Sequence, residues 1–174
     1  MSLTGSDGTP IRSVAPFEDF GTALHSAFGT VVALYERNRS GRGQVVEGSL
    51  LATGMMMMQS LLAERAVTDI VREQKGNTSF HAAPADAYRT SDGWVMVQAV
   101  SQPIFKRWAR LVVAESMLDD PRFKDDISRG NNYEEIDEAM KTWAAQRNTE
   151  QAISELEAAR VPCGKVNTLK EALD

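Results

Sequence analysis

The sequence of 174 residues predicts an α+β fold in which one antiparallel hairpin is surrounded by helices. Apolar residues recur at helical spacing over residues 22–39, which predicts a long amphipathic or largely buried helix. The dipeptide Asp92-Gly93 stands between two β-prone runs, residues 87–90 and 94–100, which is typical of a β-hairpin. Helical patterns return after the hairpin. The chain is therefore expected to contain two different structural units.

The first unit is expected to consist of helices. Ser-Gly-Arg-Gly at residues 40–43 supplies the stop of the first helix. Residues 44–47 are a plausible brief strand, and Ser49 is a candidate N-cap for a second helix that runs to about Arg65. Four consecutive methionines, residues 55–58, would cover most of that helix, so we favour adaptable core or interface packing over a direct role in lining a substrate site.

The second unit follows a charged and loop-like stretch, residues 66–84, which we interpret as a linker. After the hairpin, Pro103 suits the first turn of a helix. The candidate N-caps of the later helices are Asn131 or Asn132, Thr149 and Thr168. A single small domain with one hairpin and several helices is therefore expected after the linker.

Composition is that of an ordinary globular protein, with 43% hydrophobic and 25% charged residues. A net charge of −5 gives no electrostatic reason to expect nucleic acid or an anionic membrane as a partner. No stretch approaches the roughly 18 apolar residues of a membrane span, and no signal peptide opens the chain. The single cysteine, Cys163, excludes an intrachain disulfide. We expect a cytoplasmic protein.

The two ends of the chain are unusual. Residues 1–15 are expected to be disordered or tag-derived, because they are polar, rich in Gly, Ser and Thr, and without periodicity. The chain stops at Leu173-Asp174, inside a helical pattern. We therefore expect this sequence to be part of a longer protein.

Side chains that commonly carry out chemistry are few, and no phosphate loop, dinucleotide glycine fingerprint or metal-ligand cluster is present in the sequence. His25 lies beside the apolar stripe of a helix, where a hydrogen-bonded packing histidine is the favoured interpretation. His81 lies in a loop and is more open to a functional role. Cys163 follows a proline with no basic neighbour, so a small buried or half-buried side chain is favoured.

One carboxylate, Asp19, is the best candidate for a functional residue. It lies at or just before the start of the first helix, where unpaired backbone N–H groups favour the ionised form. An ionised carboxylate at this place is either a helix cap or a nucleophile. The residues alone leave both interpretations open.

Further landmarks follow Asp19-Phe20-Gly21-Thr22 in order along the chain. They are Ser40-Gly41-Arg42-Gly43-Gln44, Gly76-Asn77, Tyr88-Arg89-Thr90-Ser91-Asp92-Gly93, Asp120-Pro121-Arg122-Phe123, and Ala159-Arg160-Val161-Pro162-Cys163-Gly164-Lys165-Val166-Asn167. In this order they resemble the family III CoA-transferases, also called the CaiB/BaiF family, over about residues 16–174. Chains of that family are more than twice as long, so the resemblance implies a central fragment.

The resemblance implies a parent α/β fold with a large Rossmann-like domain and a smaller α+β domain. Residues 16–65 would be the C-terminal part of the large domain, residues 66–84 a linker, and residues 85–174 the small domain. A homodimer is implied for the full-length protein. Most contacts to CoA in the family precede this segment, so the isolated segment is expected to be inactive.

The resemblance also implies a reaction, the transfer of CoA from an acyl-CoA to a carboxylic acid with Asp19 as covalent nucleophile. No general base is needed, because the acceptor acid is already ionised at neutral pH. Backbone N–H groups around the turn would stabilise the developing oxyanions, and Gly21 is a candidate for close approach. Coenzyme A would enter as the acyl-CoA substrate, with no permanently bound cofactor and no metal.

Two other functions stay open. The α-methylacyl-CoA racemases share the aspartate and pair it with a histidine, which would lie upstream of this chain. The residues that follow Asp19 resemble the transferases more than the racemases. The third possibility is a non-catalytic module in which Asp19 is only a helix cap. The sequence does not identify the acyl donor, the acceptor or the residues that contact CoA.

Overall fold

Residues 3–112 and 114–173 are described by the computed structural model, and they divide into two units. The first unit is residues 10–73, and the second contains residues 3–9 and 74–173. Met1 and Ser2, in the segment predicted to be disordered or tag-derived, lie outside the described residues. So does Asp174, where the chain was predicted to stop inside a helix. Across the described residues, no helix combines the length and the apolar character needed to cross a bilayer.

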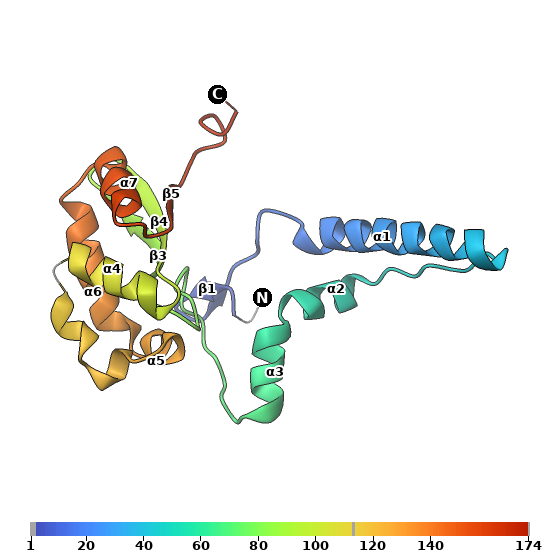
Figure 1. The fold of residues 1–174 in the computed structure, drawn as a ribbon, viewed down its shortest axis with the longest axis horizontal. Helices are drawn as coiled ribbons and strands as arrows, with labels where there is room; N and C mark the ends of the chain where they lie inside the picture. The colour runs from blue at the N-terminus through green and yellow to red at the C-terminus, as the bar shows by residue number, and fades with distance from the viewer. Residues whose placement is uncertain (1–2, 113, 174) are drawn as a thin grey trace. The chain divides into compact units, whose positions relative to one another are not determined.

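The first unit contains helices α1, Phe17–Ser40, α2, Leu50–Met57, and α3, Gln59–Val67 (Figure 1). Helix α1 ends at Gly41, whose φ of 71° is the left-handed conformation that glycine adopts without strain. The predicted cap of the second helix is confirmed, because Ser49 Oγ accepts a hydrogen bond from the Ala52 N–H at 3.2 Å.

Two predictions for this unit are wrong. Residues 44–47, all described, form no strand, because no other segment of the unit pairs with them. The helix predicted from Ser49 to about Arg65 is divided at Met58, whose φ of −101° and ψ of 11° leave the helical range. Neither proline nor a capping side chain marks this break in the sequence.

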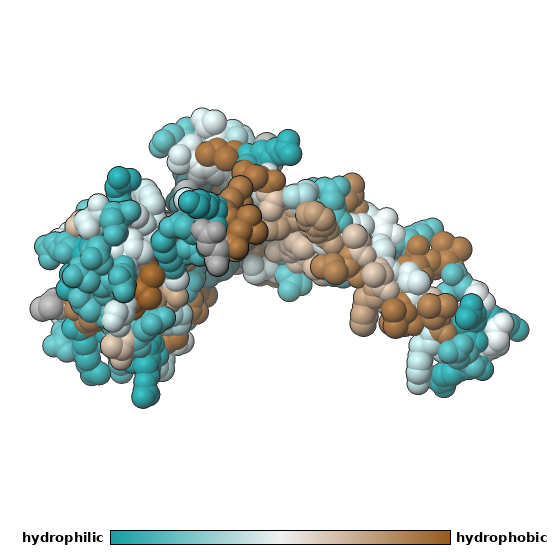
Figure 2. All heavy atoms as spheres, turned by 90° about the horizontal axis from the view of Figure 1, so that it is seen from above, coloured by the Kyte–Doolittle hydropathy of each residue, from teal (hydrophilic) through white to brown (hydrophobic). Residues whose placement is uncertain are grey.

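Within residues 10–73, all of which are described, the helices bury very little. Helix α1 buries only Gly21, α2 buries only Thr53, and α3 buries no residue. Large apolar side chains lie on the surface of the unit instead, among them Phe20, Leu24, Phe28, Val31 and Leu51. Figure 2 shows brown, hydrophobic side chains in its right-hand part, which holds α1. The four methionines are 37–52% exposed, so they form no core within this unit.

The second unit is built on a three-stranded antiparallel sheet of order β3-β4-β5. Strands β3, Ala85–Arg89, and β4, Trp94–Gln98, form the predicted hairpin, with Arg89 paired to Trp94. Strand β5, Cys163–Lys165, pairs with the other edge of β4. In the segment predicted to be disordered or tag-derived, strands β1, Gly5–Ser6, and β2, Thr9–Pro10, form a separate two-stranded sheet.

Four helices pack around this sheet (Figure 1). They are α4, Gln102–Leu111, α5, Asp126–Asn131, α6, Tyr133–Ala145, and α7, Thr149–Ala158, with short 3₁₀ turns at Glu115–Leu118 and Pro121–Phe123. The core joins Val95 and Val97 of the sheet to Phe105, Trp108 and Met140 of the helices, all fully buried. The second unit therefore has a hydrophobic core of its own.

Two predicted caps differ from the observed ones. Asn148, not Thr149, caps α7, and it forms a capping box in which Asn148 Oδ1 accepts from the Gln151 N–H and the Gln151 side chain accepts from the Asn148 N–H. Thr168 starts no helix, because residues 169–173, the described part of that segment, form turns. Asn132 occupies the N-cap position of α6, as predicted, but its side chain makes no capping hydrogen bond.

A buried cation lies among the helices of the second unit. The Arg129 side chain is fully buried, and its guanidinium donates hydrogen bonds to Asp126, to the Gln102 side chain and to the Phe123 carbonyl. It also lies over the Phe105 ring, 4.4 Å from the ring centroid. A buried charge needs such partners, because desolvation penalises it strongly. Arg129 therefore serves the packing of this unit.

Candidate functional site

Asp19 lies in the first turn of α1, as its third residue, and its side chain is exposed. The N-cap position belongs to Pro16, and among the described residues no side chain caps this helix. Asp19 is therefore not a helix cap in this structure, which removes one of the two interpretations of this carboxylate. The positive end of the helix dipole still favours a negative charge at this place.

Helix α2 contacts the first turns of α1 through Gly21. A Cβ atom at this position would lie 2.6 Å from Met57 Cε and 2.9 Å from Thr53 Cγ2, which is closer than real Cβ contacts allow. From the family resemblance, we expected the reacting groups of the substrate to approach the backbone closely at Gly21. In the structure, the close approach at Gly21 is the packing of α1 against α2.

A pair of threonine hydroxyl groups joins the same two helices. Thr22 Oγ1 lies 2.6 Å from the Glu18 carbonyl oxygen and 2.9 Å from Thr53 Oγ1. Thr53 is buried, with 6% of its surface exposed. The sequence analysis assigned no role to either threonine. The available signal was that Thr53 is the only hydroxyl residue in the otherwise apolar run of residues 50–58.

The histidines and the cysteine are distributed over the two units. His25 Nδ1 lies 2.7 Å from the Gly21 carbonyl oxygen, so the predicted hydrogen bond is confirmed, but the residue is exposed and is not a packing histidine. His81 and Cys163 belong to the second unit. Burial, together with the Glu157 carboxylate, raises the pKa of the Cys163 thiol, which disfavours the reactive thiolate.

A cavity of about 250 Å³ lies beside α1 in the first unit. Its lining includes Thr22, His25, Ser26, Glu47 and Ser49, but not Asp19. No group of three or more His, Cys, Asp or Glu side chains within residues 3–112 and 114–173 is arranged to hold a metal ion.

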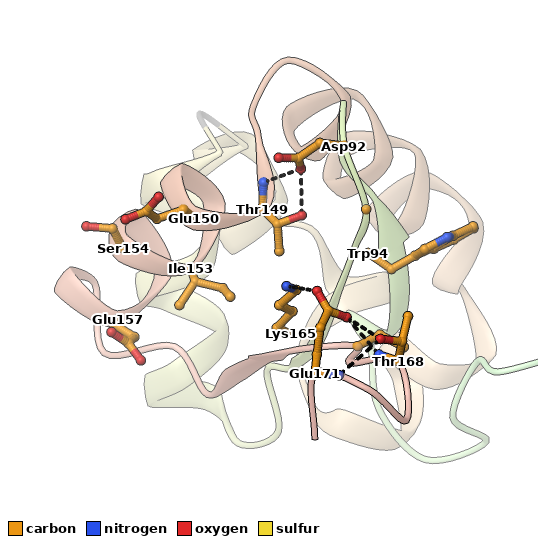
Figure 3. A pocket seen from close by; sticks show the side chains of 12 residues that line it. Asp92, Trp94, Thr149, Glu150, Ile153, Ser154, Glu157, Lys165, Thr168 and Glu171 are labelled. Carbon is orange, nitrogen blue, oxygen red and sulfur yellow. Dashed lines mark hydrogen bonds and ion pairs between the residues drawn. The ribbon is translucent and has the colours of Figure 1, made fainter. Parts of the chain in front are cut away.

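A larger cavity of about 750 Å³ lies in the second unit, between the hairpin turn, α7 and residues 165–171 (Figure 3). Its polar groups mainly bind one another. Asp92 Oδ1 accepts hydrogen bonds from Thr149 N at 2.8 Å and from Thr149 Oγ1 at 2.7 Å, and Lys165 pairs with Glu171. These contacts fasten the hairpin turn to the start of α7, so we assign them a structural role.

The Asp92 contacts predict a dependence of stability on pH. The hydrogen bonds from the Thr149 hydroxyl and amide lower the pKa of Asp92 below its usual value. A depressed pKa stabilises the fold above the unfolded-state pKa of about 3.9, and this contribution is lost as the pH falls through the folded-state pKa. We expect Asp92→Asn to reduce the loss of unfolding free energy between pH 5 and pH 3, measured by urea denaturation.

Thr149→Val provides the matched test of this prediction, because it removes the hydroxyl donor of Thr149 and leaves the Asp92 carboxylate in place. Its stability profile is expected to lie between those of the parent chain and Asp92→Asn. Equal slopes for the parent chain and Asp92→Asn across this pH range would contradict the prediction.

Solved structures define the class of fold. A hypothetical protein from Mycobacterium tuberculosis matches with a TM-score of 0.77 at 20% identity, over 99% of this chain and 45% of that one. A CaiB/BaiF family protein from Brucella suis matches with a TM-score of 0.72 at 24% identity, over 99% of this chain and 46% of that one. The chain thus has the fold of part of a CaiB/BaiF protein. The Rossmann-like parent domain stays a prediction.

The chain belongs to CoA-transferase family III, whose model matches residues 1–174. It is 33% identical to a succinyl-CoA–D-citramalate CoA-transferase of Chloroflexus aurantiacus, over 99% of this chain and 43% of that protein. It is 27% identical to a formyl-CoA:oxalate CoA-transferase of Streptomyces avermitilis, over 100% of this chain and 47% of that protein. It is 24% identical to a succinyl-CoA:glutarate CoA-transferase of Mus musculus, over 98% of this chain and 39% of that protein.

The family resemblance seen in the sequence is therefore confirmed. The chain spans less than half the length of each of these three relatives. The assignment of residues 16–65, 66–84 and 85–174 to parts of a longer protein stays a prediction.

Proposed function

We propose that this chain is part of a CoA-transferase that moves CoA between an acyl-CoA and a carboxylic acid, with Asp19 as the nucleophile. The observation that carries the proposal is an exposed carboxylate in the first turn of α1 that caps no helix among the described residues, in a chain of CoA-transferase family III. Such a carboxylate is free to react. The longer protein would supply the rest of the CoA site and would act as a homodimer.

The reaction needs four exchanges at acyl carbon atoms. A carboxylate oxygen of Asp19 attacks the thioester carbon of the donor, and the CoA thiolate leaves, which gives a mixed anhydride. The thiolate then attacks the Asp19 carbonyl carbon and releases the donor acid, which gives an aspartyl-CoA thioester. The acceptor carboxylate attacks this thioester and forms a second anhydride. The released thiolate attacks the acceptor acyl carbon, which frees Asp19 and yields the new acyl-CoA.

The place of Asp19 suits these steps. Each attack develops negative charge close to the first turn of α1, and the positive end of the helix dipole stabilises negative charge there. No proton has to be removed from the acceptor, because carboxylic acids are ionised at neutral pH. The mechanism therefore needs no histidine beside Asp19 as a general base.

The names of the relatives suggest the class of acceptor. Citramalate, glutarate and oxalate, which appear in the names of the three relatives, are all dicarboxylic acids. We therefore take short dicarboxylic acids as the acceptor class and a dicarboxylic acyl-CoA, such as succinyl-CoA, as the first donor to be tested.

Hydroxylamine trapping tests the proposal on the full-length protein. The protein is incubated with succinyl-CoA, quenched with hydroxylamine and digested, and the peptides are analysed by mass spectrometry. A hydroxamate is expected at Asp19, only when acyl-CoA is present, because hydroxylamine cleaves anhydrides and thioesters of the aspartyl group. CoA transfer without modification of Asp19 would contradict the proposal. Exchange of the α-hydrogen of a 2-methylacyl-CoA in D₂O would support the racemase alternative instead.

A further inference from the structure

The peptide group that links Glu18 to Asp19 is held by a chain of hydroxyl groups. Thr22 Oγ1 contacts both the Glu18 carbonyl oxygen, at 2.6 Å, and Thr53 Oγ1, at 2.9 Å. A hydroxyl group carries one proton, and a carbonyl oxygen can only accept. The Thr22 hydroxyl is the donor in both contacts, so its one proton is shared between the Glu18 carbonyl and Thr53 Oγ1. The buried hydroxyl of Thr53 is thereby linked to the peptide plane that carries the Asp19 nitrogen.

This link depends on the close packing of α1 against α2. Gly21 leaves no room for a Cβ atom, which brings the backbone of α1 against Thr53 and Met57. On the other side of the contact, a Cβ atom at Gly54 would lie 3.1 Å from Glu18 Oε1. All these residues belong to the first unit, and α2 meets α1 at the turns that contain and follow Asp19.

The first turn of α1 has no capping side chain among the described residues. A first turn has backbone N–H groups without partners in the helix and opens readily when no side chain caps it. Here the Thr22 hydroxyl, which also contacts the buried Thr53 of α2, donates to the carbonyl group directly before Asp19.

We propose that Thr53 is a positioning residue for the Asp19 nucleophile, acting through the Thr22 hydroxyl and the Glu18–Asp19 peptide. This inference rests on the proposed function of Asp19. Loss of the Thr53 hydroxyl widens the range of orientations that Asp19 samples, so fewer bound substrates meet it in a reactive geometry. The effect falls on the rate of acylation, whereas KM changes little, because only 6% of the Thr53 surface is exposed.

Thr53→Val in the full-length protein is the principal test, because valine keeps the shape and removes the hydroxyl. We expect kcat and the single-turnover rate of Asp19 acylation to fall about 10-fold, a size set by the loss of one buried hydrogen bond. The burst amplitude, which counts folded active sites, and the KM for acyl-CoA are expected to stay within about twofold of the parent values. Thr53→Ser, which restores the hydroxyl, is expected to recover most of the rate.

Thr30→Val is the matched control. Thr30 Oγ1 donates to the Ser26 carbonyl at 2.8 Å, which is the same bond within the same helix that Thr22 makes to Glu18. Its loss removes a helix hydrogen bond away from Asp19, so the acylation rate is expected to match that of the parent protein. Equal acylation rates in Thr53→Val, Thr30→Val and the parent protein would overturn the inference.

A second pair of variants covers the case in which valine disturbs the fold. Thr53→Ser and Thr53→Ala both lack the γ-methyl group and differ only in the hydroxyl. The inference requires faster acylation in the serine variant, and equal rates would overturn it.

Asp19→Asn distinguishes a failure of the proposed function from a failure of the positioning role alone. Full turnover by Asp19→Asn would overturn the proposed function and the positioning role together, whereas an inactive Asp19→Asn with an unaffected Thr53→Val would overturn the positioning role alone.

Discussion

Asp19→Asn in the full-length protein is expected to lower kcat for CoA transfer on the order of 10⁴-fold or more, the scale of loss when a covalent nucleophile is removed. Asparagine keeps the size and place of the side chain in the first turn of α1. Its neutral amide cannot form the anhydride, so the acyl group has no acceptor on the protein. The KM for acyl-CoA is expected to change little, because the substitution removes chemistry rather than binding.

The measurement is steady-state transfer of CoA from succinyl-CoA to a panel of dicarboxylic acids, followed by separation of the acyl-CoA products. Glu36→Gln is the control, since it makes the same change of charge toward the other end of the same helix. The control is expected to transfer CoA at the parent rate. A kcat for Asp19→Asn within about tenfold of the parent value would rule out Asp19 as the nucleophile.

Trp108→Ala is expected to lower the free energy of unfolding of the second unit by about 3–5 kcal/mol, the usual cost of truncating a buried tryptophan. The Trp108 side chain is fully buried, and its ring stacks on Phe105 with centroids 5.4 Å apart. Its Nε1–H points to Met140 Sδ at 3.0 Å. The substitution leaves a cavity between α4 and α6 and removes all of these contacts.

Trp94→Ala is the matched control for this prediction, because Trp94 lies in β4 and is 42% exposed. It is expected to cost much less, since a large part of its ring remains in water in the folded unit. Urea denaturation followed by circular dichroism measures both variants without relying on tryptophan fluorescence. Equal losses in the two variants would show that the buried ring is not a principal support of the core.

Local signals in the sequence were sufficient to predict many of the helices and strands of the second unit. Asp92-Gly93 between two β-prone runs predicted the hairpin, because this dipeptide suits the tight turn between two strands. Pro103 marked the start of α4, since proline fits the first turn of a helix. These features depend on residues close together along the chain, so they can be read without knowledge of the fold.

Contacts between distant segments could not be read in this way. Thr149 was taken as the cap of α7, but its hydroxyl binds Asp92, far away in the sequence, and Asn148 caps the helix. The division between α2 and α3 at Met58 carries no local signal either. In both places the deciding interactions or conformation arise only once the chain has folded.

The candidate site was predicted in part. The residues placed Asp19 near the start of a helix and left two roles open, helix cap and nucleophile. The observed N-cap position at Pro16 excludes the role of helix cap. The role of Thr53 was not predicted, because an isolated threonine in an apolar run gives no sign of its partner on another helix. The choice of Asp19 as nucleophile came from the family resemblance, and the experiments above test it directly.

The order of the strands in the second unit has a consequence for synthesis on the ribosome. Strand β4 is the centre of the sheet, and its second neighbour, β5, is made only after helices α4 to α7. One edge of β4 therefore stays unpaired until Cys163–Lys165 has left the exit tunnel. The apolar helices α1 and α2 are translated earlier still. We expect the nascent chain to expose hydrophobic surface and an open strand edge at the same time, which makes it a natural client of chaperones.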